Sequence, residues 1–210
     1  MKNNVFIMGD SYSTYKGYIP DGYHAYYSDV RAEAPIVRGV EKTWWNILAK
    51  EKNLNIVVND SFSGSTVCNT VRENHTVDVS FVSRIDKYIS EKFFEQNKIN
   101  TMFIFGGTND SWINCPIGEL KFSDWSADEL KCVLPAFCYV ITRAKEVAEN
   151  TLVIINTKLK QEITEGVIEA CEKIGVGYLC LNEIDKENGH PTELGMKQIS
   201  EQIAECLDKH

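Results

Sequence analysis

The chain has 210 residues, of which 43% are hydrophobic and 25% are charged, a composition typical of one globular domain and unlike that of a disordered chain. Its 30 acidic residues outnumber its 22 basic ones, which gives a formal net charge of −8. This balance disfavours a nucleic acid or an anionic membrane as the main partner and favours neutral substrates. We therefore expect a single domain over residues 1–210, with no nucleic-acid or membrane partner.

Five short apolar runs predict the strands of a buried sheet. Each run is rich in β-branched or aromatic residues, as is typical of a strand that is covered on both faces. In chain order the runs lie at residues 5–8, 54–58, 102–105, 152–155 and 176–181.

Longer segments with helical periodicity lie between and after these runs, at residues 42–51, 79–94, 127–149, 162–174 and 193–207. In the third of them, Ser126 and Glu129 have the spacing of a capping box, and Pro135 predicts a kink. The alternation of strands and helices predicts a parallel sheet with helices on both faces. In such sheets ligands bind at the carboxyl ends of the strands.

Residues 12–40 fit neither pattern and predict a long connection. Connections of this length are usually functional or disordered, and the many tyrosines argue against disorder. These tyrosines occupy positions 12, 15, 18, 23, 26 and 27.

The seven cysteines predict a reduced, cytoplasmic protein. Their number is odd and no two have the C-x-x-C spacing of a zinc ribbon or a thioredoxin-like motif. The apolar run at residues 5–8 is too short for a signal-peptide core, and no run approaches the ~20 apolar residues of a membrane span. No His, Asp or Glu cluster has the spacing of metal ligands, so we expect no metal and no other cofactor.

Small and polar residues follow the predicted strands in four blocks, at residues 9–13, 59–66, 106–110 and 187–191. Taken singly, each block is weak, because a serine after a strand is most often a helix cap and a glycine-rich turn is most often only a turn.

Together the four blocks resemble those of the SGNH or GDSL-type hydrolase superfamily, in the same order and over nearly the whole chain. Tyr12 stands where the name-giving motif has leucine. The resemblance implies a flavodoxin-like, three-layer α/β/α domain with a five-stranded parallel sheet. The matching residues are Gly9-Asp10-Ser11, Gly64, Gly107-Thr108-Asn109-Asp110 and His190-Pro191.

The resemblance also implies the roles of these residues. Ser11 would be the nucleophile and His190 the base that takes its proton. The backbone N–H groups of Ser11 and Gly64 and the side-chain amide of Asn109 would form the oxyanion hole. Asp10 and Asp110 are expected to support the site or its turns rather than to transfer protons.

The acid of the expected triad is the point where the chain departs from the family. The family places an aspartate three residues before the histidine, where this chain has Glu187, and Asp185 lies two residues earlier. Glu187 would fill the role with one more methylene, or Ser11 and His190 would act as a dyad assisted by a backbone carbonyl. A third interpretation makes Glu187 a solvated loop charge.

The predicted function is a serine esterase or deacylase that hydrolyses short-chain acyl esters, carried by a small molecule or a carbohydrate, through an acyl-enzyme on Ser11. An acyltransferase with the same site and a catalytically silent carbohydrate-binding relative are the alternatives. Tyr12 and Trp112 are predicted to contact the substrate, since flat rings with a polar edge suit sugar faces. The tyrosines of residues 12–40 either help to shape this pocket or only pack the connection onto the domain.

Overall fold

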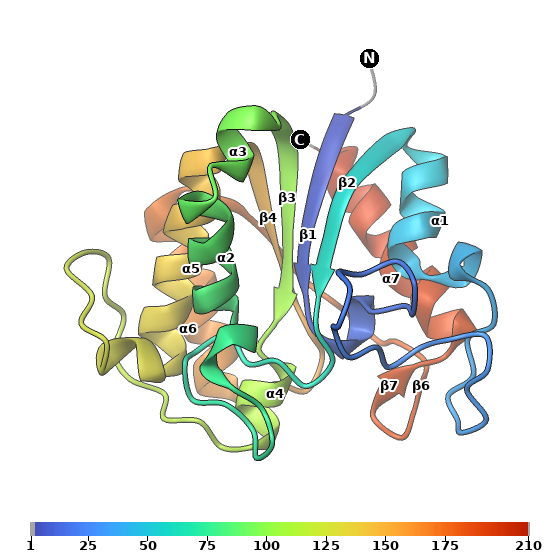
Figure 1. The fold of residues 1–210 in the computed structure, drawn as a ribbon, viewed down its shortest axis with the longest axis horizontal. Coiled ribbons are helices and arrows are strands. Elements are labelled where there is room, and N and C mark those ends of the chain that lie inside the picture. Colours follow the sequence, from blue (N-terminus) through green and yellow to red (C-terminus); the bar gives the residue numbers. More distant parts are fainter. Residues whose placement is uncertain (1–2, 210) are drawn as a thin grey trace.

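The computed structural model describes residues 3–209, and its centre is one sheet of five parallel strands (Figure 1). The strands are β1 (Asn3–Gly9), β2 (Leu54–Ser61), β3 (Ile99–Gly106), β4 (Ala148–Ile155) and β5 (Gly177–Cys180). Their order, β2-β1-β3-β4-β5, is the flavodoxin-like order of a doubly wound sheet. The predicted five-stranded parallel sheet is therefore confirmed.

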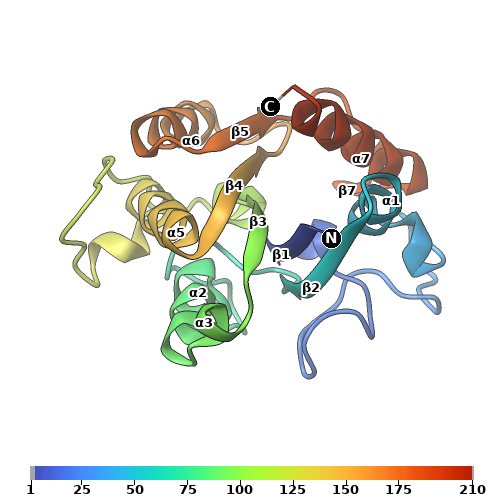
Figure 2. The ribbon, with the colours of Figure 1, turned by 90° about the horizontal axis from the view of Figure 1, so that it is seen from above.

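Helices cover both faces of this sheet and complete the three layers (Figure 2). One face carries α1 (Trp44–Glu51) and α7 (Glu193–Leu207), and the other carries α2 (Phe81–Ser90), α5 (Val133–Val147) and α6 (Gln161–Ile174). Alternate strand residues serve the two layers: Phe6 packs in the core under α2, α5 and α6, whereas Val5 and Ile7 pack in the core under α1 and α7. This double burial explains why the strands read as unbroken apolar runs.

The predicted helix over residues 79–94 is in fact two helices, α2 and α3 (Phe93–Gln96). Between them, Lys92 adopts a left-handed conformation with φ of 56°, which the helical pattern of apolar residues does not reveal. Such a residue ends a helix because its backbone cannot continue the right-handed turn.

The predicted helix over residues 127–149 begins later than expected. The capping box is present, since the Ser126 N–H donates to Glu129 at 2.7 Å and the Glu129 N–H donates to the Ser126 hydroxyl at 3.3 Å. However, it lies at the start of the short 3-10 turn Glu129–Lys131, and α5 starts only at Val133. Pro135 therefore lies in the first turn of α5, where no backbone N–H is needed, and the predicted kink was wrong.

Short elements at the carboxyl ends of the strands were not predicted from the sequence. They are α4 (Thr108–Trp112), a hairpin of β6 (Lys186–Glu187) and β7 (His190–Pro191), and the 3-10 turns Ser11–Ser13, Val40–Lys42 and Val77–Val79. Figure 1 places α4 and the hairpin together with the loop from residues 12–40 at this end of the molecule.

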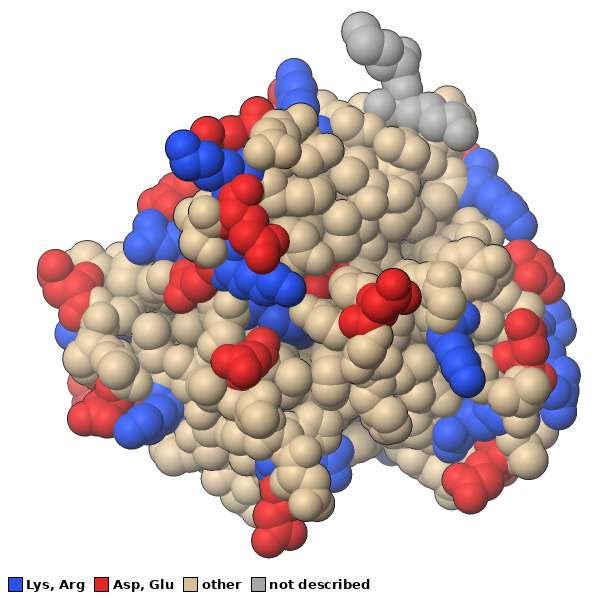
Figure 3. Space-filling model, in the orientation of Figure 1, with Lys and Arg blue, Asp and Glu red and all other residues tan. Residues whose placement is uncertain are grey.

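The surface shown in Figure 3 intersperses Lys and Arg with Asp and Glu side chains, and its lower edge is indented at the end where α4 and the hairpin lie. Within residues 3–209, no helix is both long enough and apolar enough to cross a bilayer.

Candidate active site

Ser11 lies directly beyond the carboxyl end of β1, in the 3-10 turn Ser11–Ser13. The Asp10 side chain caps this turn by accepting the Tyr12 N–H at 3.0 Å. Gly9 is needed just before it, because a Cβ there would lie 2.4 Å from the hydroxyl of Ser61 on β2. The turn brings the Ser11 hydroxyl to 2.9 Å from Nε2 of His190, so two residues 179 positions apart have the contact expected of a nucleophile and its base.

His190 is held by the β6–β7 hairpin and by two tyrosines. The hairpin turns through Asn188 and Gly189, which both have positive φ. The Tyr12 hydroxyl donates to the Gly189 carbonyl, and the Tyr27 hydroxyl donates to the Pro191 carbonyl at 2.8 Å. Both tyrosines are fully buried, so Tyr12 is placed to hold this turn rather than to line an open surface.

The second ring nitrogen of His190 meets a backbone carbonyl instead of a carboxylate. Nδ1 lies 3.3 Å from the carbonyl oxygen of Asn188. Glu187 pairs with His190 through the β6–β7 ladder, but its exposed carboxylate makes no hydrogen bond to the imidazole within residues 3–209. Asp185 instead accepts a hydrogen bond from the Thr192 hydroxyl. Of the alternatives that the sequence left open, the geometry matches the dyad assisted by a carbonyl.

Two backbone donors of the expected oxyanion hole are free to bind a ligand. Neither Ser11 nor Gly64 has an acceptor for its backbone N–H among the residues that the structure describes. Gly64 has φ of +90°, and a Cβ there would lie 3.0 Å from the His75 ring. A side chain at this position would therefore be strained and crowded, which explains the glycine.

The third donor, the Asn109 side chain, is fixed by bonds at both ends of its amide. Nδ2 donates to the Ser65 carbonyl at 2.9 Å, which leaves its second N–H for a substrate oxygen. Oδ1 accepts from Nη1 of Arg72 at 3.0 Å. The guanidinium both fixes the orientation of the amide and draws electron density from it, which strengthens its N–H as a donor. Sequence reasoning missed Arg72, and nothing in its local pattern marks it.

Aromatic rings surround the imidazole of His190. The Tyr26 ring stacks on it with centroids 3.6 Å apart and planes 7° apart. The Trp112 ring meets it edge to face at 5.7 Å and is 45% exposed, which agrees with its predicted place on the rim. The tyrosine-rich connection thus does both things that the sequence allowed: Tyr12 and Tyr27 pack inside, and Tyr26 reaches the site.

The electrostatic surroundings of His190 favour its neutral form. Burial lowers its pKa from 6.5 to about 4, assisted by the positive charges of Arg31, Lys186 and Arg72, while the Asn188 carbonyl opposes the shift. A general base must be unprotonated to accept the serine proton, so the site is ready to react well below neutral pH.

We therefore expect kcat/KM for an uncharged ester to stay constant from pH 8 to about 5 and to fall by half near pH 4, because only the neutral imidazole is active. The measurement is a pH series with product quantified by chromatography, and circular dichroism at each pH shows whether the fold persists. A fall in kcat/KM with its midpoint at pH 6.5 or above would contradict the buried environment of His190.

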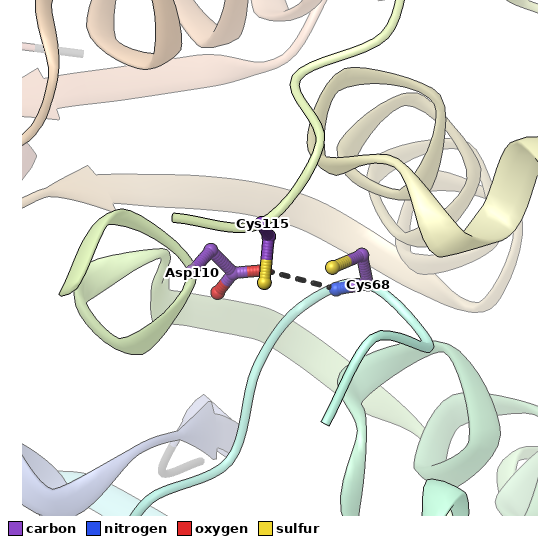
Figure 4. Close-up of side chains that lie close together, drawn as sticks. All are labelled: Cys68, Asp110 and Cys115. Carbon is purple, nitrogen blue, oxygen red and sulfur yellow. Dashed lines mark hydrogen bonds between the residues drawn. The ribbon is translucent and has the colours of Figure 1, made fainter. Parts of the chain in front are cut away.

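Asp110 supports the site from a buried cluster with Cys68 and Cys115 (Figure 4). Its carboxylate accepts the N–H of Val67 at 2.9 and 3.0 Å and the N–H of Cys68 at 3.1 Å. These bonds tie α4 to the loop that follows β2, and so hold the two segments that carry the Asn109 amide and the Gly64 N–H in register.

The cluster of Cys68, Asp110 and Cys115 was not foreseen from the sequence, because Asp110 lies in α4 while the two cysteines lie in connections before and after it. Their side-chain ligand atoms lie within 4.8 Å of one another, as in a metal site. A hydrogen bond with Cys115, together with burial, raises the pKa of the Cys68 thiol, which opposes the thiolate that a metal needs. We therefore interpret the cluster as a structural contact, and the expectation of no metal stays a prediction.

A pocket of about 820 Å³ lies at the opposite end of the sheet, among residues that include Val5, Leu54 and Leu152. It is lined by the amino-terminal halves of the strands and contains neither Ser11 nor His190. In doubly wound sheets the ligand binds at the carboxyl ends, so we place the site at the Ser11–His190 pair.

Comparison with known proteins finds a family model and several solved structures that match the chain. A model of the family described as GDSL-like lipase/acylhydrolase matches residues 3–207. A GDSL-like lipase structure from Bacteroides ovatus is 36% identical, with a TM-score of 0.89 and 100% of both chains covered. A second, from Bacteroides uniformis, is 34% identical with a TM-score of 0.89, covering 100% of this chain and 97% of that one.

More distant structures share the fold. A carbohydrate acetylesterase from Sinorhizobium meliloti is 14% identical with a TM-score of 0.64, and 99% of each chain is covered. No curated protein matches the chain.

Proposed function

Because the chain belongs to the GDSL-like lipase/acylhydrolase family, we propose that it is a serine ester hydrolase that uses Ser11 as nucleophile and His190 as base. The observation that carries this proposal is the 2.9 Å contact between the Ser11 hydroxyl and Nε2 of His190, beside unoccupied backbone donors. A hydroxyl, a base and preorganised N–H groups are the parts that acyl transfer needs.

The reaction begins when Ser11 attacks the ester carbonyl and its proton passes to Nε2 of His190. The carbonyl oxygen becomes negative and receives hydrogen bonds from the N–H groups of Ser11 and Gly64 and from the Asn109 amide. His190 then gives the proton to the departing alcohol, which leaves an acyl group on Ser11. In the second half, His190 takes a proton from water as the water oxygen attacks the acyl carbonyl. The bond to the Ser11 oxygen then breaks, His190 returns the proton to that oxygen, and the acid is released.

The backbone carbonyl of Asn188 takes the place of a triad acid in this proposal. As an acceptor it keeps the proton of neutral His190 on Nδ1, which leaves the lone pair of Nε2 facing Ser11. It supplies less stabilisation to the imidazolium than a carboxylate would, because it carries no full charge. The Tyr26 ring adds to the stabilisation of the imidazolium, since the face of an aromatic ring attracts a cation.

We further propose that the acyl group is short and that the alcohol part is a small polar molecule or a sugar. The described rings in contact with His190 come from Tyr12, Tyr26 and Trp112, and none of these offers the aliphatic wall that a long chain requires. The half-exposed Trp112 ring suits the flat face of a sugar.

A series of p-nitrophenyl esters from acetyl to octanoyl tests this substrate class. We expect kcat/KM to be highest for acetyl or propionyl and to fall about 100-fold by octanoyl, because extra methylenes find no apolar surface to bury. The Ser11→Ala variant gives the background rate for each ester. A value that rises steadily from acetyl to octanoyl would reject the short-chain proposal and leave the nucleophile assignment standing.

A further inference from the structure

Arg31 brings a positive charge to the candidate active site, although the chain as a whole is acidic. Its guanidinium carbon lies 3.9 Å from the centroid of the Tyr26 ring, and that ring stacks directly on His190 at 3.6 Å. The side chain is 20% exposed, so a molecule that enters from solvent reaches it.

The hydrogen-bonding capacity of Arg31 is largely unused. A guanidinium has five N–H donors, and the described residues offer Arg31 one hydrogen bond, from Nη1 to the Tyr26 carbonyl at 3.3 Å. Its Nε is buried and has no hydrogen-bond partner within residues 3–209. The nearest carboxylate, that of Glu33, is 3.8 Å from Nη2 and 89% exposed, which makes a weak ion pair.

A guanidinium that is mostly removed from water and has few acceptors is costly unless an anion binds the remaining N–H groups. The other arginine of residues 12–40, Arg38, is exposed and donates to the carbonyl of Asp29. The unpaired donors of Arg31 thus distinguish it from a solvated surface charge.

The position of Arg31 relates it to the alcohol part of an ester. In the proposed reaction His190 gives its proton to the departing alcohol, so this part of the substrate lies on the His190 side of the site. Arg31 lies near this side as well, because its guanidinium stacks on the Tyr26 ring and that ring stacks on His190.

We propose that Arg31 binds a carboxylate on the alcohol part of the substrate, so that the preferred substrates are acyl esters of hydroxy acids, such as acylated sugar acids. A carboxylate matches the planar fork of the guanidinium and is held by paired hydrogen bonds. The inference rests on the proposed ester hydrolase function.

A bound carboxylate would also assist the base. Arg31 disfavours protonation of His190, yet the transition state places a positive charge on that ring. The substrate carboxylate offsets the charge of Arg31 at the moment when His190 becomes imidazolium. The substrate carboxylate thus supplies the negative charge that the β6–β7 hairpin does not place beside His190.

The test compares two esters of similar size, 3-acetoxybenzoate and 3-acetoxybenzamide, on the full chain. Both release a substituted phenol and acetate, and they differ in the carboxylate. We expect the parent to hydrolyse the carboxylate ester with a kcat/KM about 10- to 100-fold higher than that of the amide, the range of a charge-assisted hydrogen bond. In Arg31→Met this ratio should fall to about 1, while Arg38→Met, which removes one charge from the same connection, should keep the parental ratio.

The ratio of the two esters is the readout because it cancels any loss that both substrates share, such as a shift of Tyr26. A parental ratio near 1, an unchanged ratio in Arg31→Met, or an equal loss in Arg38→Met would each overturn the proposal. The outcome separates it from the proposed function: if the parent hydrolyses neither ester faster than Ser11→Ala, the function itself fails, whereas hydrolysis of both without preference rejects only the role of Arg31.

Discussion

Replacing Ser11 by alanine should lower kcat for p-nitrophenyl acetate by about 10⁴-fold or more, because the hydroxyl that forms the acyl-enzyme is removed. The fold should persist. The Ser11 side chain is small, and its hydroxyl makes one hydrogen bond among the described residues, to His190.

Ser13 provides the matched control for this variant. It lies two residues away in the same 3-10 turn, but its hydroxyl accepts the indole N–H of Trp44 at 3.2 Å on the inner side of the turn. Ser13→Ala should therefore lose some stability and retain most of its turnover. Folded Ser11→Ala protein with near-parental activity would refute the assignment of the nucleophile.

Replacing His190 by alanine should lower kcat about as much as the loss of Ser11. The nucleophile and its base act as a unit, so removing either one disables both. Glu187→Gln should change kcat by less than about 3-fold. The carboxylate is exposed and makes no hydrogen bond to the imidazole, so water and salt screen its effect on the charge of His190. Steady-state kinetics on both variants, with thermal unfolding as the folding control, measures the difference.

The comparison of these variants decides between dyad and triad. If Glu187→Gln lowers kcat by 100-fold or more, the hairpin rearranges when substrate binds and Glu187 is the acid. Asp185→Asn serves as the neighbouring control: it weakens the bond to Thr192, which caps α7, and should reduce stability more than turnover.

Much of this site could be predicted because parallel strands all deliver their following residues to one edge of the sheet. Ser11 follows β1, Gly64 follows β2 and Asn109 follows β3, so their order along the chain already placed them together. The apolar runs predicted the strands because both faces of a parallel sheet are buried, so its strands are apolar at every position rather than at alternate ones.

The partner of Nδ1 could not be predicted, because it depends on two backbone angles. The positive φ values at Asn188 and Gly189 turn a carbonyl toward His190 and leave Glu187 in solvent. A spacing of three residues between Glu187 and His190 is compatible with either arrangement.

Arg31 and Arg72 were missed for another reason. They lie in connections without regular structure, where no periodicity links position to direction, and each acts on a residue far away in the chain. The net charge of −8 was equally uninformative about the site, because an overall balance says nothing about which charges converge on one histidine.

The central claim is that Ser11 is the activated nucleophile of an ester hydrolase, and covalent labelling with a fluorophosphonate tests it most directly. Intact-mass analysis of the parent should show one adduct, and peptide mapping should place it on Ser11. The His190→Ala variant should react far more slowly, because the hydroxyl then lacks its base. A folded parent that takes up no label, or takes it up on another residue, would contradict the account.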